Sequence, residues 1–75
     1  MASWDVSLFA YLRERHGSVV TVEAEPTAGA ILAALTDAGI NTIACRLAVG
    51  DEFVRPESAV PEGAPIALIP PVSGG

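Results

Sequence analysis

Apolar and polar residues alternate along the start of the chain with a period of two, which is typical of a β-strand with one buried face. The apolar residues of one parity there are Trp4, Val6 and Leu8. Phe9 has the other parity, and together they predict a strand over residues 4–10. A β-branched run predicts a second strand over residues 18–25. The charged residues 11–17 between them are expected to form a short helical turn or loop, so that the two strands make a hairpin.

The pattern changes to a helical period over residues 25–39. The expected apolar stripe of this helix consists of Ile31, Leu32, Leu35 and Ala38. Thr27 is placed to cap the N-terminus of the helix, and Gly39 is placed to end it. These signals predict the main helix of the domain.

The second half of the chain predicts three further strands, over residues 42–50, 52–54 and 66–69, with a loop over residues 55–65. The residues expected on one face of the first of these strands are Ile43, Cys45, Leu47 and Val49. The order of elements predicts an α+β fold, a mixed sheet of about four to five strands packed on one main helix. Residues 1–69 are expected to form the domain, and residues 70–75 a projecting tail.

Length and charge restrict the possible functions. The chain has 75 residues, enough for one domain, and a net charge of −5 from nine acidic residues and four arginines, with no lysine. This charge argues against binding nucleic acid or an anionic membrane and favours partners with basic clefts. Without a signal-peptide pattern or a long apolar segment, and with a single cysteine, a cytoplasmic protein is expected.

Residues that could carry catalysis are few. His16 is the only histidine and falls in a charged stretch, so a solvated side chain is expected rather than a general base. Cys45 shares its parity with apolar residues, which favours a buried structural thiol over a nucleophile. One cysteine and one histidine cannot form a zinc site. We therefore expect no metal site and no active site of the chain's own.

The C-terminal segment is the most unusual chemical feature, and it consists of Pro70, Pro71, Val72, Ser73, Gly74 and Gly75. The prolines have no N–H group and end the last strand, and the glycines have no side chain to obstruct a narrow channel. Gly75 carries the α-carboxylate, which becomes reactive only when adenylation by ATP turns its oxygen into a leaving group. A flexible terminus without function is the alternative interpretation.

Four stretches resemble the small subunit of molybdopterin synthase, in a match that runs over nearly the whole chain. They are VSLFAYLRERHG, TAGAILAAL, LAVGDEFV and EGAPIALIPPVSGG. The ending IPPVSGG is the most specific, because the related sulfur carriers of the thiamine pathway also end in two glycines but usually lack the double proline. The resemblance implies a β-grasp, or ubiquitin-like, fold with a flexible Gly-Gly tail.

The resemblance also implies a sulfur carrier that is not itself an enzyme and holds no permanent cofactor. An E1-like enzyme would adenylate Gly75 with ATP, and a sulfur donor such as a cysteine desulfurase or rhodanese would convert it to a thiocarboxylate. The large synthase subunit, which holds the catalytic residues, would then receive the tail and transfer the sulfur to the pterin precursor of the molybdenum cofactor. The implied assembly is a heterotetramer of two small and two large subunits.

Strand parity predicts where such partners dock. The expected docking face lies on the side of the sheet away from the helix and consists of Phe9, Arg46, Ala48, Ala67 and Ile69. Arg13 is a further candidate, for a contact with the activating enzyme. Scattered apolar side chains on an ordinary surface, and a solvated arginine, are the alternatives.

Three other functions fit the same residues. The protein could carry sulfur for thiamine, cysteine or another pathway. It could be a modifier joined through Gly75 to lysines of target proteins, although a chain without lysine cannot form chains linked through its own lysines. It could also be a plain interaction domain with an idle tail.

Overall fold

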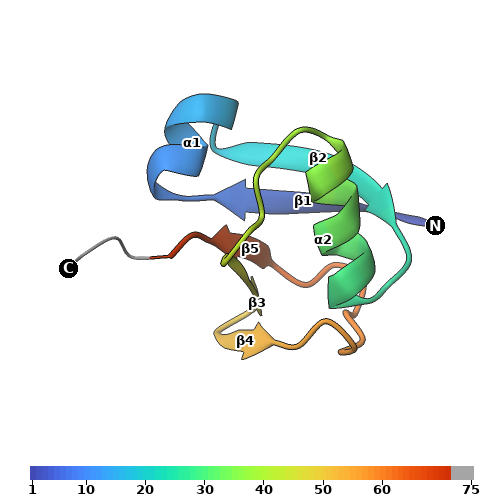
Figure 1. Cartoon of the computed structure of the whole chain (residues 1–75). Coiled ribbons are helices and arrows are strands. Elements are labelled where there is room, and N and C mark those ends of the chain that lie inside the picture. Colours follow the sequence, from blue (N-terminus) through green and yellow to red (C-terminus); the bar gives the residue numbers. More distant parts are fainter. Residues whose placement is uncertain (72–75) are drawn as a thin grey trace.

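The computed structural model describes residues 1–71 of the chain. In chain order the elements are β1 (Ala2–Leu8), α1 (Ala10–His16), β2 (Val19–Ala24), α2 (Ala28–Asp37), β3 (Arg46–Val49), β4 (Glu52–Val54) and β5 (Ile66–Ile69). The strands form one sheet in the order β2-β1-β5-β3-β4, and α2 lies across one face of it (Figure 1). The predicted α+β architecture, a mixed sheet packed on one main helix, is confirmed.

β5 is the last strand in the sequence but the middle strand of the sheet. It pairs in parallel with β1, where Leu8 lies beside Leu68, and antiparallel with β3, where Arg46 lies beside Ile69. A parallel pair cannot be joined by a tight turn, so its connection must cross over the sheet. The segment between β1 and β5 makes this crossover, and it contains both helices and the other three strands.

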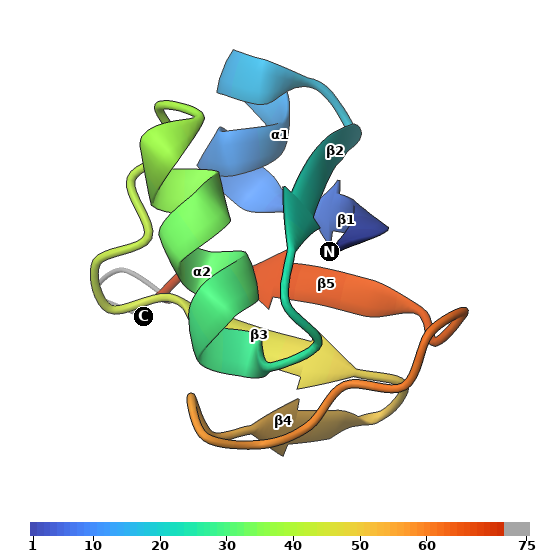
Figure 2. The same ribbon diagram turned by 90° about the vertical axis from the view of Figure 1, so that its right-hand side faces the viewer.

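The core lies between α2 and the sheet face that it covers, which we call the inner face (Figure 2). The buried residues of β1 and β5 on this face are Trp4, Val6, Leu8, Ile66 and Leu68. Strand parity therefore predicted the inner face correctly. Trp4 is the only one of these residues with a polar side-chain group, and its Nε1–H donates to the Ala24 carbonyl oxygen at 3.0 Å. The indole is thus buried without losing its hydrogen bond.

The ends of α2 form as the sequence predicted. The Thr27 hydroxyl accepts a hydrogen bond from the Ala30 N–H at 3.2 Å, and Gly39 follows the helix with a φ of +94°, in the region that favours glycine. The predicted apolar stripe is only partly correct. The buried residues of α2 are Ala28, Ile31 and Leu35, whereas Leu32 of the predicted stripe is half-buried and Ala38 is exposed. Neither helix of the described residues is long and apolar enough to cross a bilayer.

The third strand is shorter than predicted, because it starts at Arg46 and not at residue 42. Ile43 precedes it and is 80% exposed, so the prediction that Ile43 shares a strand face with Leu47, which is buried, is wrong. Two local features interrupt the strand alternation here. The Asn41 side-chain oxygen accepts the Ile43 N–H at 3.1 Å, which forms a turn, and Ala44 has a φ of +63°.

The predicted hairpin of the first two strands is present as an antiparallel pair, and its connection is the helix α1, the helical one of the two expected forms. The buried side chain of Leu12 anchors α1 to the core. The charged residues of α1 around it are exposed, which agrees with their polar sequence.

The N-cap of α2 gives a first test of the fold. Thr27→Ala removes the oxygen that accepts the Ala30 N–H, and we expect it to lower the free energy of unfolding by about 1 kcal/mol. Thr27→Ser keeps this oxygen and is expected to retain most of the stability. Urea unfolding followed by circular dichroism measures both variants. Equal stability of Thr27→Ala and the wild type would show that the cap does not stabilise α2.

Candidate functional site

The chain leaves the sheet at the end of β5, between two neighbouring strands. Ile69 is the last residue of β5 and pairs with Arg46, and the proline that follows has no N–H to continue the ladder. Pro70 is buried and Pro71 is exposed, so the described chain leaves the body of the domain at Pro71. The tail residues named in the sequence analysis as Val72, Ser73, Gly74 and Gly75 lie outside the described residues.

The sheet face opposite α2, which we call the outer face, carries a row of small and apolar side chains beside this exit. Residues that lie directly opposite each other on paired strands share a face. The row that crosses all five strands consists of Val19, Ser7, Ala67, Ala48 and Phe53. Val19 and Phe53 keep 52% and 50% of their surface exposed at its two ends, and the three small residues between them are half-buried.

A second, shorter row lies nearer the exit. Ile69 and Arg46 are cross-strand neighbours in it. Phe9 follows β1 with an extended backbone, so it continues the strand alternation on the outer side, and it is 44% exposed. The Arg46 guanidinium lies over the Phe53 ring, 4.0 Å from its centroid, which links the two rows through a cation–π contact. We call the two rows together the tail-root patch.

All five residues of the predicted docking face belong to this patch, which is an observation about their position and leaves docking itself a prediction. Arg13 does not belong to it, since it lies exposed on α1. Sequence reasoning missed Phe53 and Val19. A signal for Phe53 was present, because the two-residue turn at Gly50–Asp51, with Gly50 at a φ of +62°, sets Phe53 opposite Ala48. Val19 could not be assigned to the outer face from the sequence, because the register between β1 and β2 depends on the length of α1, which connects them.

The rest of the outer face is polar. Its side chains on β1 and β2 are Ser3, Asp5, Thr21 and Glu23. Within this group the Thr21 hydroxyl donates to an Asp5 carboxylate oxygen at 2.7 Å. The outer face is therefore divided into a solvated acidic half and an apolar half, and the chain exits beside the apolar half. Such a division is typical of a surface that binds a protein over part of its area.

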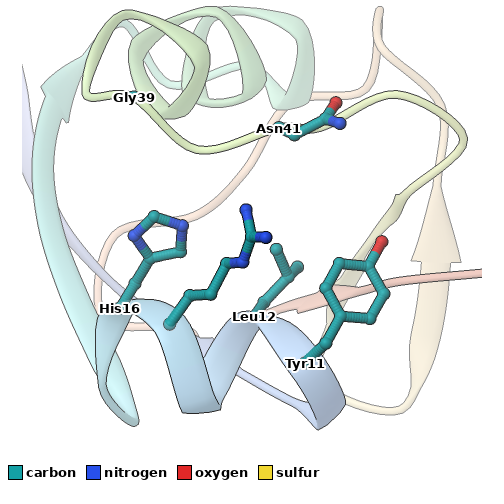
Figure 3. A pocket seen from close by; sticks show the side chains of 6 residues that line it. Tyr11, Leu12, His16, Gly39 and Asn41 are labelled. Atoms are coloured by element: carbon teal, nitrogen blue, oxygen red, sulfur yellow. The ribbon is translucent and has the colours of Figure 1, made fainter.

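The residues weighed for catalysis, His16 and Cys45, lie outside the tail-root patch. His16 is exposed and lines a pocket of about 410 Å³ between α1 and the segment after α2 (Figure 3). Its other lining residues are Tyr11, Leu12, Arg15, Gly39 and Asn41. Within residues 1–71 no group of three or more histidine, cysteine or acidic residues is placed to hold a metal ion.

Cys45 is not the fully buried strand residue that was predicted. It is half-buried and lies before β3, where its Sγ is 3.7 Å from the Asn41 carbonyl oxygen. Burial raises the pKa of the Cys45 thiol above its ordinary value. Because the thiolate is the nucleophile, this position is unsuited to nucleophilic catalysis at neutral pH.

Comparison with known proteins identifies a family and solved structures that match nearly the whole chain. The model of the ThiS family matches residues 6–75. The crystal structure of SAMP1 from Haloferax volcanii is 31% identical, with 99% of this chain and 100% of that chain covered and a TM-score of 0.72. A crystal structure of H. volcanii small archaeal modifier protein 1 is 29% identical, with 96% and 100% covered and a TM-score of 0.71. No curated protein sequence matches the chain. The structural similarity confirms the predicted β-grasp, ubiquitin-like fold.

The environment of Cys45 predicts how its reactivity depends on pH. Because its raised pKa lowers the thiolate fraction, we expect the native protein to react with iodoacetamide more slowly than the same protein unfolded in urea. The native rate should also increase over a higher pH range than the unfolded rate. Mass spectrometry of quenched samples gives both rates. Equal rates of the native and unfolded protein at every pH would contradict this assignment.

Proposed function

The chain belongs to the ThiS family of ubiquitin-like sulfur carriers, and from this premise we propose that it carries sulfur as a thiocarboxylate at Gly75. The observation that carries the proposal is the family match, which runs through the Gly74–Gly75 pair to residue 75. In the proposed cycle the Gly75 carboxylate attacks ATP, pyrophosphate leaves, and an acyl adenylate forms. Adenylation thus activates a carboxylate that is unreactive by itself. Hydrosulfide supplied by the donor then attacks the acyl carbon, the C–O bond to AMP breaks and AMP leaves, and loss of the S–H proton gives the thiocarboxylate.

The geometry of the domain supports a role in which it presents the tail to other proteins. The chain leaves from the middle of the sheet, so a partner that binds the tail also meets the surfaces of both neighbouring strands. The tail-root patch lies at this exit and offers apolar surface for such a contact. The two prolines favour an extended start of the tail, and the two glycines suit a narrow channel. Membership in the family implies an E1-like adenylating enzyme as one partner and a catalytic protein as another.

For the pathway, we propose synthesis of molybdopterin. The support is the ending IPPVSGG, whose double proline resembles the small subunit of molybdopterin synthase more than the thiamine-pathway carriers. The proposed acceptor is then the large synthase subunit, in a heterotetramer, and the sulfur goes to the pterin precursor. A thiamine or cysteine pathway would use the same chemistry at Gly75 with a different acceptor.

A second candidate is a protein modifier joined to target lysines through Gly75. The observation that favours it is the similarity to H. volcanii small archaeal modifier protein 1, a protein whose name states a modifier role. The same adenylation step serves both functions, and they diverge at the nucleophile that attacks the acyl carbon. A sulfur nucleophile gives the carrier, and a lysine amine gives a conjugate.

The mass of the protein distinguishes the two. After incubation with the E1-like enzyme of the same organism, ATP and a sulfur donor, we expect an increase of about 16 Da, since sulfur replaces one carboxylate oxygen. A variant with one alanine added after Gly75 is the control, and its mass should not change. An unchanged wild-type mass would contradict sulfur loading at Gly75. Conjugates to other proteins in cell extract, without the thiocarboxylate form, would favour the modifier.

The docking face gives a separate prediction. Phe9→Arg places a charge in the tail-root patch, and we expect it to weaken binding of the large synthase subunit by roughly 10-fold or more, because a charge would be desolvated in the contact. Tyr11→Arg is the matched control, because Tyr11 is similarly exposed, at 46%, but lies on α1 outside the patch. Calorimetric titration measures both. Equal affinities of Phe9→Arg and the wild type would show that this part of the patch is not the docking face.

A further inference from the structure

Arg46 is the only charged residue of the tail-root patch, and it lies beside the strand residue from which the tail departs. The remaining members are the two phenylalanines, the aliphatic residues and Ser7. The other arginines lie outside the patch, two on α1 and one in the loop after β4. A single cation surrounded by small apolar side chains therefore marks one defined point of the surface.

From this arrangement we infer that the E1-like partner places an aspartate or glutamate carboxylate on the Arg46 guanidinium when it docks on the tail-root patch. The inference rests on the proposed function, since it concerns the enzyme that would adenylate Gly75. It specifies one chemical group of the partner and its position relative to the tail.

The contact with Phe53 holds the guanidinium ready for such a carboxylate. The guanidinium carbon lies 4.0 Å from the ring centroid, and a guanidinium has five N–H donors, so a contact with one ring leaves donors for a partner. Among residues 1–71 Arg46 forms no ion pair and donates no side-chain hydrogen bond. Because the ring restricts the side chain before binding, less conformational entropy is lost when a partner binds it.

Desolvation explains why the partner has to supply an acceptor. A protein that covers Ala48, Ala67 and Ile69 also removes water from the neighbouring guanidinium. Buried donors left without acceptors are strongly unfavourable, and a carboxylate satisfies two of them through a pair of parallel hydrogen bonds. An apolar or basic group at this point would be rejected, so the contact would also contribute to specificity.

The position of the ion pair relates it to the tail. Arg46 pairs with Ile69, the last strand residue before Pro70. A carboxylate held there would fix the rotation of the domain on its partner close to the point where the tail starts. The direction in which the tail enters the partner would follow from this one contact, and orientation of a reacting group is a large contribution to reactivity.

The absence of lysine from the chain allows a direct test. Arg46→Lys keeps the positive charge and places the only side-chain amine of the chain in the patch. A water-soluble carbodiimide, which joins amines to carboxylates without a spacer, is then applied to the complex with the E1-like enzyme of the same organism. We expect peptide mass spectrometry to find position 46 joined to an aspartate or glutamate of the enzyme. Arg15→Lys is the matched control, because Arg15 lies on α1 outside the patch, and it should give no such product.

A kinetic measurement accompanies the coupling experiment. Arg46→Gln should raise the KM for the carrier in ATP–pyrophosphate exchange by roughly 30-fold, a loss typical of truncating one partner of a desolvated ion pair. Arg15→Gln removes the same charge elsewhere and should leave the KM unchanged. Normal KM of Arg46→Gln, or coupling that is equal at positions 15 and 46, would overturn the inference while adenylation of the wild type upholds the proposed function. No exchange activity with the wild type would instead contradict the proposed function.

Discussion

The pairing of β5 between β1 and β3 is the constraint on which the rest of the structure depends. It buries Ile66 and Leu68 against α2 and turns Ala67 and Ile69 to the outer face. It also brings the C-terminal end of the fold to the centre of the sheet. If β5 were an edge strand, the tail would leave beside one strand only, and a partner would meet little of the sheet while binding it.

The two prolines after β5 define the point at which the chain leaves the sheet. Neither proline can donate to the ladder, and the N–H positions of successive strand residues point to opposite neighbours, so Pro70 and Pro71 together prevent β5 from continuing on either side after Ile69. Pro70 is still buried and Pro71 is not, so the change from domain to tail takes place within one residue. A tail with a sharply defined root suits a protein whose reactive group is supplied to other proteins, since the distance from body to tip is then set by few residues.

Charged residues are distributed unevenly between the tail-root patch and the rest of the domain surface. No acidic residue belongs to the tail-root patch, and Asp5 and Glu23 lie on the polar part of the outer face. The patch itself carries one cation held by an aromatic ring. A small domain can thus attract partners with basic surfaces through its net charge and still select the correct orientation through one contact of the opposite sign.

Short-range patterns in the sequence were sufficient for most of the fold. Alternation over β1 and β5 identified the inner face, and Thr27 and Gly39 marked both ends of α2, because strand parity and helix caps depend on neighbouring residues only. The same local reasoning assembled five residues of the patch. It failed at Ile43, where the chain has to travel from the end of α2 back to the sheet and a positive φ at Ala44 breaks the alternation.

The order of the strands and the contacts between distant segments were decided by the tertiary structure alone. The sequence contains no local signal that Ile69 will lie beside Arg46, or that Val19 will lie in one row with Ala67, because register between distant strands depends on how the whole chain crosses over. The guanidinium of Arg46 lies on the Phe53 ring of the neighbouring strand, a side-chain contact that strand alternation alone did not predict. The residues proposed for the tail chemistry could therefore be identified in the sequence, whereas the complete surface around the start of the tail could be described only from the folded structure.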